Sequence, residues 1–70
     1  MIVYDRLWST MRKKNMTQYK LIHTYRVSPA QITRLKRNQN VNTHTINMLC
    51  EILDCPVEAV MEYRKSETSE

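Results

Sequence analysis

The sequence predicts a small all-α domain of five helices, on the basis of three observations. Apolar residues recur at intervals of three and four along most of the chain, which is the spacing of one helix face. Residues typical of helix starts and stops lie between these recurrences. No long segment alternates apolar and polar residues, so a sheet domain is not expected. The 70 residues allow one domain, which we expect over residues 1–63, followed by a flexible tail without apolar residues at 64–70.

The first two helices are predicted from an apolar stripe and from the residues at their ends. The stripe of the first helix consists of Tyr4, Leu7, Trp8 and Met11. We expect this helix to end near Asn15, because asparagine tolerates the left-handed backbone of a helix stop. Thr17 can cap a short second helix, since its hydroxyl can accept from a free backbone amide. The inward side chains expected on that helix are Leu21, Ile22 and Tyr25.

The last three helices are predicted from start signals and apolar spacing. Ser28 before Pro29 indicates a third helix over residues 29–37. The serine hydroxyl can accept from a free backbone amide at the helix start, and proline is favoured at the first helical position because the N–H it lacks would have no partner there. Thr43 can cap a fourth helix, whose stripe is Ile46, Leu49, Cys50 and Leu53. A fifth helix after Pro56 would end near Tyr63, with an inner face of Val57, Val60 and Met61. Residues 1–3 are compatible with a short strand in an oligomer.

Charge is distributed unevenly along the chain. Residues 1–40 contain nine Lys or Arg and one Asp, a net charge of +8, whereas residues 41–70 contain two Lys or Arg and six Asp or Glu, a net charge of −4. A basic surface attracts phosphate by releasing condensed counterions. The first half of the chain therefore favours a polyanionic partner, although a merely solvated basic surface is the alternative.

Residues 17–38 predict a short helix, a tight turn and a capped second helix, which is the arrangement of a helix-turn-helix motif. On a helical wheel, Ile32 and Leu35 point together toward the core. The opposite side is small near its start and basic farther along, which suits a helix that enters the major groove. The residues expected to contact bases are Ala30, Gln31, Thr33 and Arg34. Those expected to contact phosphates are Gln18, Arg37, Gln39, Asn40 and His44.

This segment resembles the Cro and lambda-repressor-like family of helix-turn-helix regulators, also called the XRE family. The resemblance covers about residues 4–63 and rests on Thr17-Gln18, Leu21, Val27-Ser28, Ile32, Leu35, Ile46 and the run from Leu49 to Cys55, which is similar to the compact single-domain branch. It implies a five-helix fold, frequent homodimerisation and binding to paired half-sites. Three features depart from the family pattern. Many members pair an arginine of the first helix with a glutamate of the third, and these positions are here Met11 and Lys36. Ile22 stands where a small residue is usual, and Arg26 stands where glycine serves a turn of positive φ.

Other classes of site are not expected. The side chains of His23, His44, Cys50 and Cys55 lack the close ligand pairs of common zinc sites, and we expect both cysteines to be reduced thiols. No glycine-rich oxyanion loop or enclosed site supports an enzyme. The sequence also predicts no cofactor, no small-molecule ligand, no membrane span and no secretory signal, and hence a cytoplasmic protein.

Two functions of different classes remain open at this point. The first is a homodimeric transcriptional regulator that binds an inverted repeat in double-stranded DNA. Its dimer surface would include Met48, Ile52 and Tyr63, unless these are scattered surface residues. The second is a protein-interaction module, such as an antitoxin or adaptor, built on the same helical fold.

Overall fold

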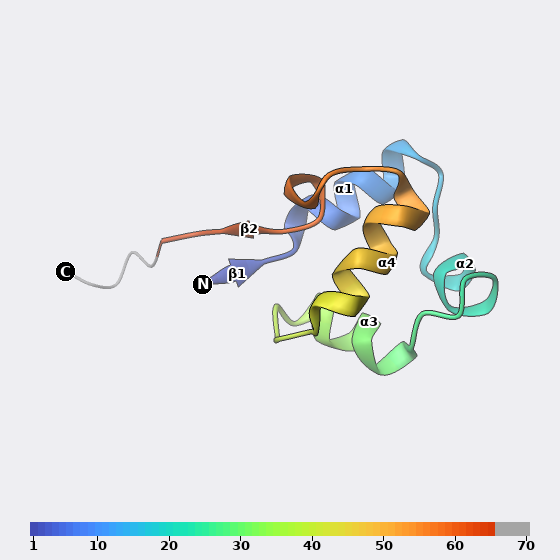
Figure 1. The fold of residues 1–70 in the computed structure, drawn as a ribbon, viewed down its shortest axis with the longest axis horizontal. Helices are drawn as coiled ribbons and strands as arrows, with labels where there is room; N and C mark the ends of the chain where they lie inside the picture. Colours follow the sequence, from blue (N-terminus) through green and yellow to red (C-terminus); the bar gives the residue numbers. More distant parts are fainter. Residues whose placement is uncertain (66–70) are drawn as a thin grey trace.

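The computed structural model describes residues 1–65 as a mostly helical domain with a small sheet (Figure 1). In chain order its elements are β1 (Ile2–Val3), α1 (Asp5–Lys13), α2 (Gln18–His23), α3 (Pro29–Lys36), α4 (Thr43–Leu53), the 3₁₀ turn η1 (Val57–Ala59) and β2 (Glu62–Tyr63). None of the helices within residues 1–65 is long and apolar enough to cross a membrane. Residues 66–70 of the expected tail lie outside the described residues, so the tail stays a prediction.

All four α-helices contribute fully buried leucines to one core. Leu7 comes from α1, Leu21 from α2 and Leu35 from α3, and α4 adds Leu49 and Leu53. Trp8 packs against this cluster from the side and is half-buried. Tyr25, expected to face inward, is instead 41% exposed, because α2 ends at His23 and the helical spacing does not extend to residue 25.

The expected fifth helix is wrong. Only one 3₁₀ turn forms after Pro56, and the chain then becomes extended at Glu62–Tyr63. Val60 is buried as expected, but Val57 is 47% exposed, so the short segment has too little apolar surface to hold a helix against the core. Its backbone gains partners elsewhere, because β2 pairs antiparallel with β1 in the register Ile2 with Tyr63 and Val3 with Glu62. The expected strand at residues 1–3 thus pairs within the chain.

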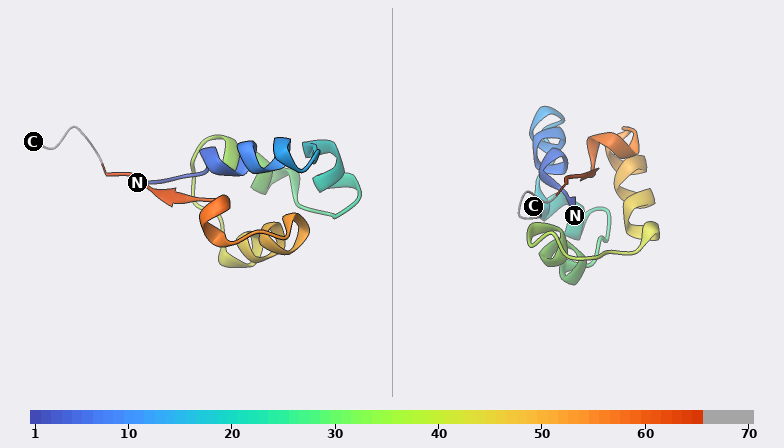
Figure 2. Two further views of the ribbon diagram at one scale, coloured as in Figure 1. Left: turned by 90° about the horizontal axis from the view of Figure 1, so that it is seen from above. Right: turned by 90° about the vertical axis from the view of Figure 1, so that its left-hand side faces the viewer.

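The two-stranded sheet projects from one end of the helical body (Figure 2) and is flanked by ion pairs. The Glu62 carboxylate lies 2.6 Å from Arg6 Nε and 2.7 Å from Arg64 Nη2, and Arg64 also reaches Asp5 at 3.2 Å. A hydrogen bond from Arg64 is the main cause of a lowered pKa of Glu62, which keeps this carboxylate ionised. Exposed ion pairs contribute little individually, so we regard this cluster chiefly as fixing the position of β2 beside α1.

Each α-helix is followed by one residue with left-handed backbone, although the chain contains no glycine. These residues are Asn15, Arg26, Asn38 and Asp54, with φ between 51° and 64°. After α1, α3 and α4, the next amide donates to the carbonyl five residues earlier, as in a Schellman motif: Met16 to Met11, Gln39 to Arg34 and Cys55 to Cys50. The expectations of a helix stop at Asn15 and a positive φ at Arg26 are both confirmed.

The helix starts follow the sequence signals with one correction. Thr17 accepts from the Lys20 amide at 3.1 Å, and Ser28 accepts from the Ala30 amide at 3.2 Å, which confirms both expected caps. The cap of α4 is Asn42 and not Thr43, since the Asn42 side chain accepts from the Thr45 amide at 2.9 Å. Asparagine and threonine are both good N-cap residues, so residue type alone could not decide which of these two neighbours caps α4.

A pair of long-range hydrogen bonds connects the end of α3 to the start of α1. The backbone N–H of Tyr4 donates to the Asn38 side-chain oxygen at 3.0 Å. The Tyr4 hydroxyl donates to the Gln39 carbonyl, also at 3.0 Å. Tyr4 is buried, so its amide would lose a partner without Asn38. We call this pair of contacts the Tyr4–Asn38 link.

Replacing Arg26 with glycine should stabilise the domain. A side chain other than that of glycine is strained in the left-handed region, and relief of that strain, partly offset by the extra entropy of unfolded glycine, should raise the free energy of unfolding by up to about 1 kcal/mol. Urea denaturation measures this value. Asn15→Gly is the matched control and should change stability less, because asparagine tolerates this backbone. An Arg26→Gly variant less stable than the wild type would contradict the strain argument.

Removing the Asn38 side chain should destabilise the domain. Asn38→Gly retains the left-handed backbone but leaves the Tyr4 amide without its acceptor, so we expect the free energy of unfolding to fall by about 1–2 kcal/mol. Asn38→Asp keeps an acceptor oxygen at the same position and should stay within about 0.5 kcal/mol of the wild type. Equal stability of the glycine and aspartate variants in urea denaturation would show that the bond contributes nothing.

Candidate nucleic-acid interface

The segment from α2 to α3 forms a helix-turn-helix. Thr17 caps the six-residue α2, and Ser28 caps α3, whose first residue is Pro29. The connection is closed by a hydrogen bond from the Val27 amide to the Leu21 carbonyl at 2.9 Å. The side chains of Val27 and Leu21 are both buried, so the turn is anchored in the core. The start of α3 is thereby held in a defined position relative to α2.

The two faces of α3 have different environments. Ile32 and Leu35 are buried in the core, as expected from the helical wheel. Four residues on the other side are exposed: Ala30, Thr33, Arg34 and Arg37, the last being the C-terminal cap residue. The structure therefore brings three of the four expected base-contacting residues onto one exposed surface.

The fourth of these residues, Gln31, lies on the flank of α3 that faces α4. It is half-buried, and the Thr45 hydroxyl lies 3.3 Å from its side-chain oxygen and 3.1 Å from that of Asn42. Thr45 itself is buried. The contact orients the Gln31 amide at the edge of the exposed surface. A second side chain is also oriented locally, because the Thr33 hydroxyl donates to the Pro29 carbonyl at 3.1 Å.

The expected phosphate-contacting residues form two groups, one at the start of α2 and one that runs from the end of α3 into α4. Gln18 is the first residue of α2 and is half-buried. The other four are exposed and follow one another from the end of α3 into α4: Arg37, Gln39, Asn40 and His44. In Figure 1, α2 and the loop between α3 and α4 lie at opposite ends of α3. The elements that carry the two groups thus lie at opposite ends of α3.

All the charged side chains over residues 6–50, which include the helix-turn-helix, are those of lysine or arginine, apart from the histidines. Residues 6–50 contain nine Lys or Arg and no Asp or Glu. Within residues 1–65 the ion pairs join Arg6 and Arg64 to Asp5 and Glu62, and none involves α2 or α3. The positive charges of the helix-turn-helix therefore remain available to an external anion.

The expected dimer residues lie in two places. Met48 and Ile52 belong to α4 and are half-buried against the core, whereas Tyr63 is on β2 and is 69% exposed. In Figure 1 the sheet that carries Tyr63 extends away from α4. Within one chain these residues therefore do not form a single patch.

Sequence reasoning missed the residues that hold the loop after α3. Asn38 and Tyr4 join this loop to α1, and Thr45 contacts the Gln31 side chain. Asparagine after a basic helix could have indicated the left-handed stop. No local signal pairs residue 38 with residue 4, because that contact depends on the tertiary arrangement.

Comparison with known proteins agrees with this geometry. The structure is similar to the crystal structure, form II, of the transcriptional regulator VanUg, with a TM-score of 0.84 and 25% sequence identity over 93% of this chain and 87% of that chain. No curated protein sequence gives a significant match. Residues 6–66, most of the chain, match the Cro/C1-type helix-turn-helix DNA-binding domain. The chain therefore belongs to the Cro/C1-type family, also called the XRE family, of helix-turn-helix DNA-binding domains.

Proposed function

We propose that this protein binds double-stranded DNA in a sequence-specific manner and regulates transcription, with α3 in the major groove. The observation that carries the proposal is the exposed side of α3, where Ala30, Thr33 and Arg34 stand opposite the buried Ile32 and Leu35. A capped helix with one anchored face and one exposed basic face needs no rearrangement to enter a groove about 12 Å wide. The similarity to a protein described as a transcriptional regulator supports the regulatory role.

The residue types on this surface suit contacts with base edges. Arg34 can donate two hydrogen bonds to guanine, and Ala30 and the Thr33 methyl can contact thymine methyl groups. Gln31 can pair with adenine, because its side-chain oxygen has a second lone pair beyond the one directed at Thr45. The bond from Thr33 to Pro29 turns its hydroxyl back toward the helix, which favours the methyl contact.

Phosphate contacts at both ends of α3 would set its position in the groove. Gln18 suits one DNA strand, and Arg37, Gln39, Asn40 and His44 suit the other, because phosphates border the major groove on both sides. The Tyr4–Asn38 link would hold the second group in place by fixing the loop to α1.

We further propose that the protein acts as a homodimer on an inverted repeat, with half-sites separated by about 34 Å or a multiple of it. A single α3 contacts few base pairs, so two copies are needed to specify a long site. Tyr63 is the strongest of the three candidate interface residues, because it is large, aromatic and exposed. Met48 and Ile52 have less surface to offer, since both already pack against the core.

Substitution of Arg34 and Arg37 separates base recognition from phosphate binding. On a site obtained by in vitro selection, Arg34→Ala should lose about 1–3 kcal/mol of binding free energy and relax the preference at one base pair. Arg37→Ala should weaken binding to all sequences alike and reduce the slope of log K against log salt by about 1. Fluorescence anisotropy at several salt concentrations measures both quantities.

The matched control is Lys13→Ala, which removes one positive charge from α1 outside the helix-turn-helix. It should leave base preference unchanged. If Arg34→Ala behaves like this control, α3 is not the reading helix. If the wild type selects no duplex at low salt and instead copurifies with a stoichiometric protein partner, the protein-interaction role replaces the regulator role.

Substitution of Tyr63 tests the dimer. Tyr63→Ser should raise the dimer dissociation constant by about tenfold or more, because an exposed aromatic anchor commonly contributes over 1 kcal/mol to an interface. Sedimentation velocity across a concentration series measures this constant. Tyr19→Ser is the matched control, since Tyr19 is 70% exposed on α2, and it should not change the constant. A monomeric wild type both alone and on selected DNA would contradict the proposal.

A further inference from the structure

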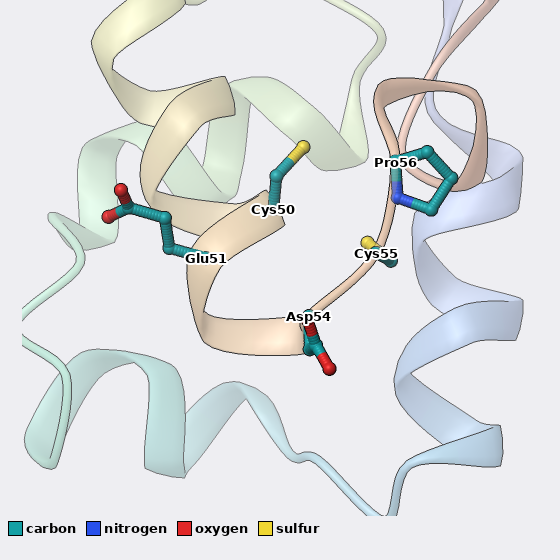
Figure 3. Close-up of a pocket in the computed structure, with 5 residues that line it drawn as sticks. All are labelled: Cys50, Glu51, Asp54, Cys55 and Pro56. Carbon is teal, nitrogen blue, oxygen red and sulfur yellow. The ribbon is translucent and has the colours of Figure 1, made fainter.

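The two cysteines of the chain lie together at the C-terminal end of α4. Cys50 is in the last turn of the helix, and Cys55 is the second residue after its end. Both are free thiols, and both are half-buried. Together with Glu51, Asp54 and Pro56 they line one open cavity of about 470 Å³ (Figure 3). Nothing in the helix-turn-helix uses this site, which belongs to α4 and the segment that follows it.

The backbone at this point brings the two thiols to the same side. Asp54 has φ 51° and ψ 57°, which turns the chain back so that the Cys55 amide donates to the Cys50 carbonyl at 3.1 Å. With standard bond lengths this bond limits the separation of the two Cα atoms to less than about 7 Å. Disulfides usually span about 4.4–6.8 Å between Cα atoms. An apolar contact between the side chains at these two positions frequently accompanies a Schellman motif, and here both residues are cysteines that line one cavity.

Burial and nearby charges affect the reactivity of Cys50. Burial is the largest cause of a raised pKa of Cys50, followed by the neighbouring Cys55 thiol and by repulsion from Glu58. Cys50 is therefore protonated at neutral pH and is a poor first nucleophile. Glu51 and Asp54 also line the cavity, but their carboxylates point away from the two sulfur atoms (Figure 3).

We propose that Cys50 and Cys55 form a redox-active dithiol, which a small-molecule disulfide oxidises to an intramolecular disulfide. The Cys55 thiolate attacks one sulfur of the reagent and expels one thiolate, which leaves a mixed disulfide on Cys55. Cys50 then loses its proton and attacks the Cys55 sulfur, which expels the second thiolate. The two protein thiols are oxidised, the reagent is reduced to two thiols, and the two protons released by the protein are taken up by those thiolates.

The expected consequence is local. The new bond would close a ring from residue 50 to residue 55 and fasten the end of α4 to the chain that enters η1. That turn is held on α1 by a hydrogen bond from the Thr10 hydroxyl to the Ala59 carbonyl at 2.8 Å. Oxidation would thus add a covalent restraint between α4 and the segment packed on α1. This inference does not depend on the proposed function, because it needs no contact with DNA.

The test exposes the full chain to redox buffers with increasing ratios of oxidised to reduced glutathione. Free thiols are then trapped by alkylation under denaturing conditions and counted by mass spectrometry. We expect both thiols to disappear together, in a monomer lighter by two hydrogen atoms, and dithiothreitol to restore them. The oxidised monomer should exceed the mixed disulfide by about tenfold or more, because the short span between the two residues gives the second thiol a high effective concentration.

Two comparisons sharpen this test. Cys50→Ser should stop at the mixed disulfide, whereas Cys55→Ser, which keeps only the poorer nucleophile, should form its mixed disulfide more slowly. Circular dichroism reports whether each variant is folded. Because glutathione disulfide is negatively charged, the uncharged bis(2-hydroxyethyl) disulfide should react faster with the wild type. Glu58→Gln should reduce this difference in rate, because Glu58 is the carboxylate whose charge acts on Cys50. If the wild type accumulates a stable mixed disulfide or a covalent dimer instead, the proposal is wrong. That outcome is decisive even if a serine variant fails to fold.

Discussion

The burial of Ile32 and Leu35 is the interaction on which the candidate interface depends. These two side chains fix α3 against a core to which every α-helix contributes at least one fully buried leucine. A helix of eight residues is too short to be stable alone in water. Its exposed side can therefore be polar and basic only because its other side is anchored. Loss of this anchor would remove the candidate interface together with the fold.

The helix ends are the second constraint, and they are met without glycine. Four left-handed residues let short helices change direction within a few residues, and asparagine or aspartate occupies three of these positions. Arg26 is the exception, and it lies in the turn of the helix-turn-helix. A cationic side chain there adds charge near the proposed DNA surface, at some expense in backbone strain. The same type of helix end at α4 brings the two thiols together, so one backbone device serves two unrelated sites.

The sequence predicted what local signals determine. The four α-helices, the Thr17 and Ser28 caps and the inward Ile32 and Leu35 each depend on residues within one or two turns. The positive φ at Arg26 was expected from the family resemblance alone. Predictions were wrong or missing where the structure depends on residues far apart in the sequence. Residues 62–63 become a strand because residues 2–3 offer backbone partners, and Asn38 finds Tyr4 only in the folded chain. At the candidate site, helical spacing predicted which side chains of α3 are exposed. The contact between Gln31 and Thr45 could not be predicted in this way, because it depends on where α4 packs.

The choice of capping residues is consistent with the proposed partner. Thr17, Ser28 and Asn42 are all neutral, although aspartate caps equally well and interacts more favourably with the positive end of a helix. An aspartate at residue 17 or 28 would place a negative charge beside the surface that we propose faces phosphates. Such an aspartate would not reduce the stability of the helix, but its negative charge would weaken binding to a polyanion. The lack of any carboxylate from residue 6 to residue 50 therefore fits a surface whose charge is set by its partner and not by the needs of the fold.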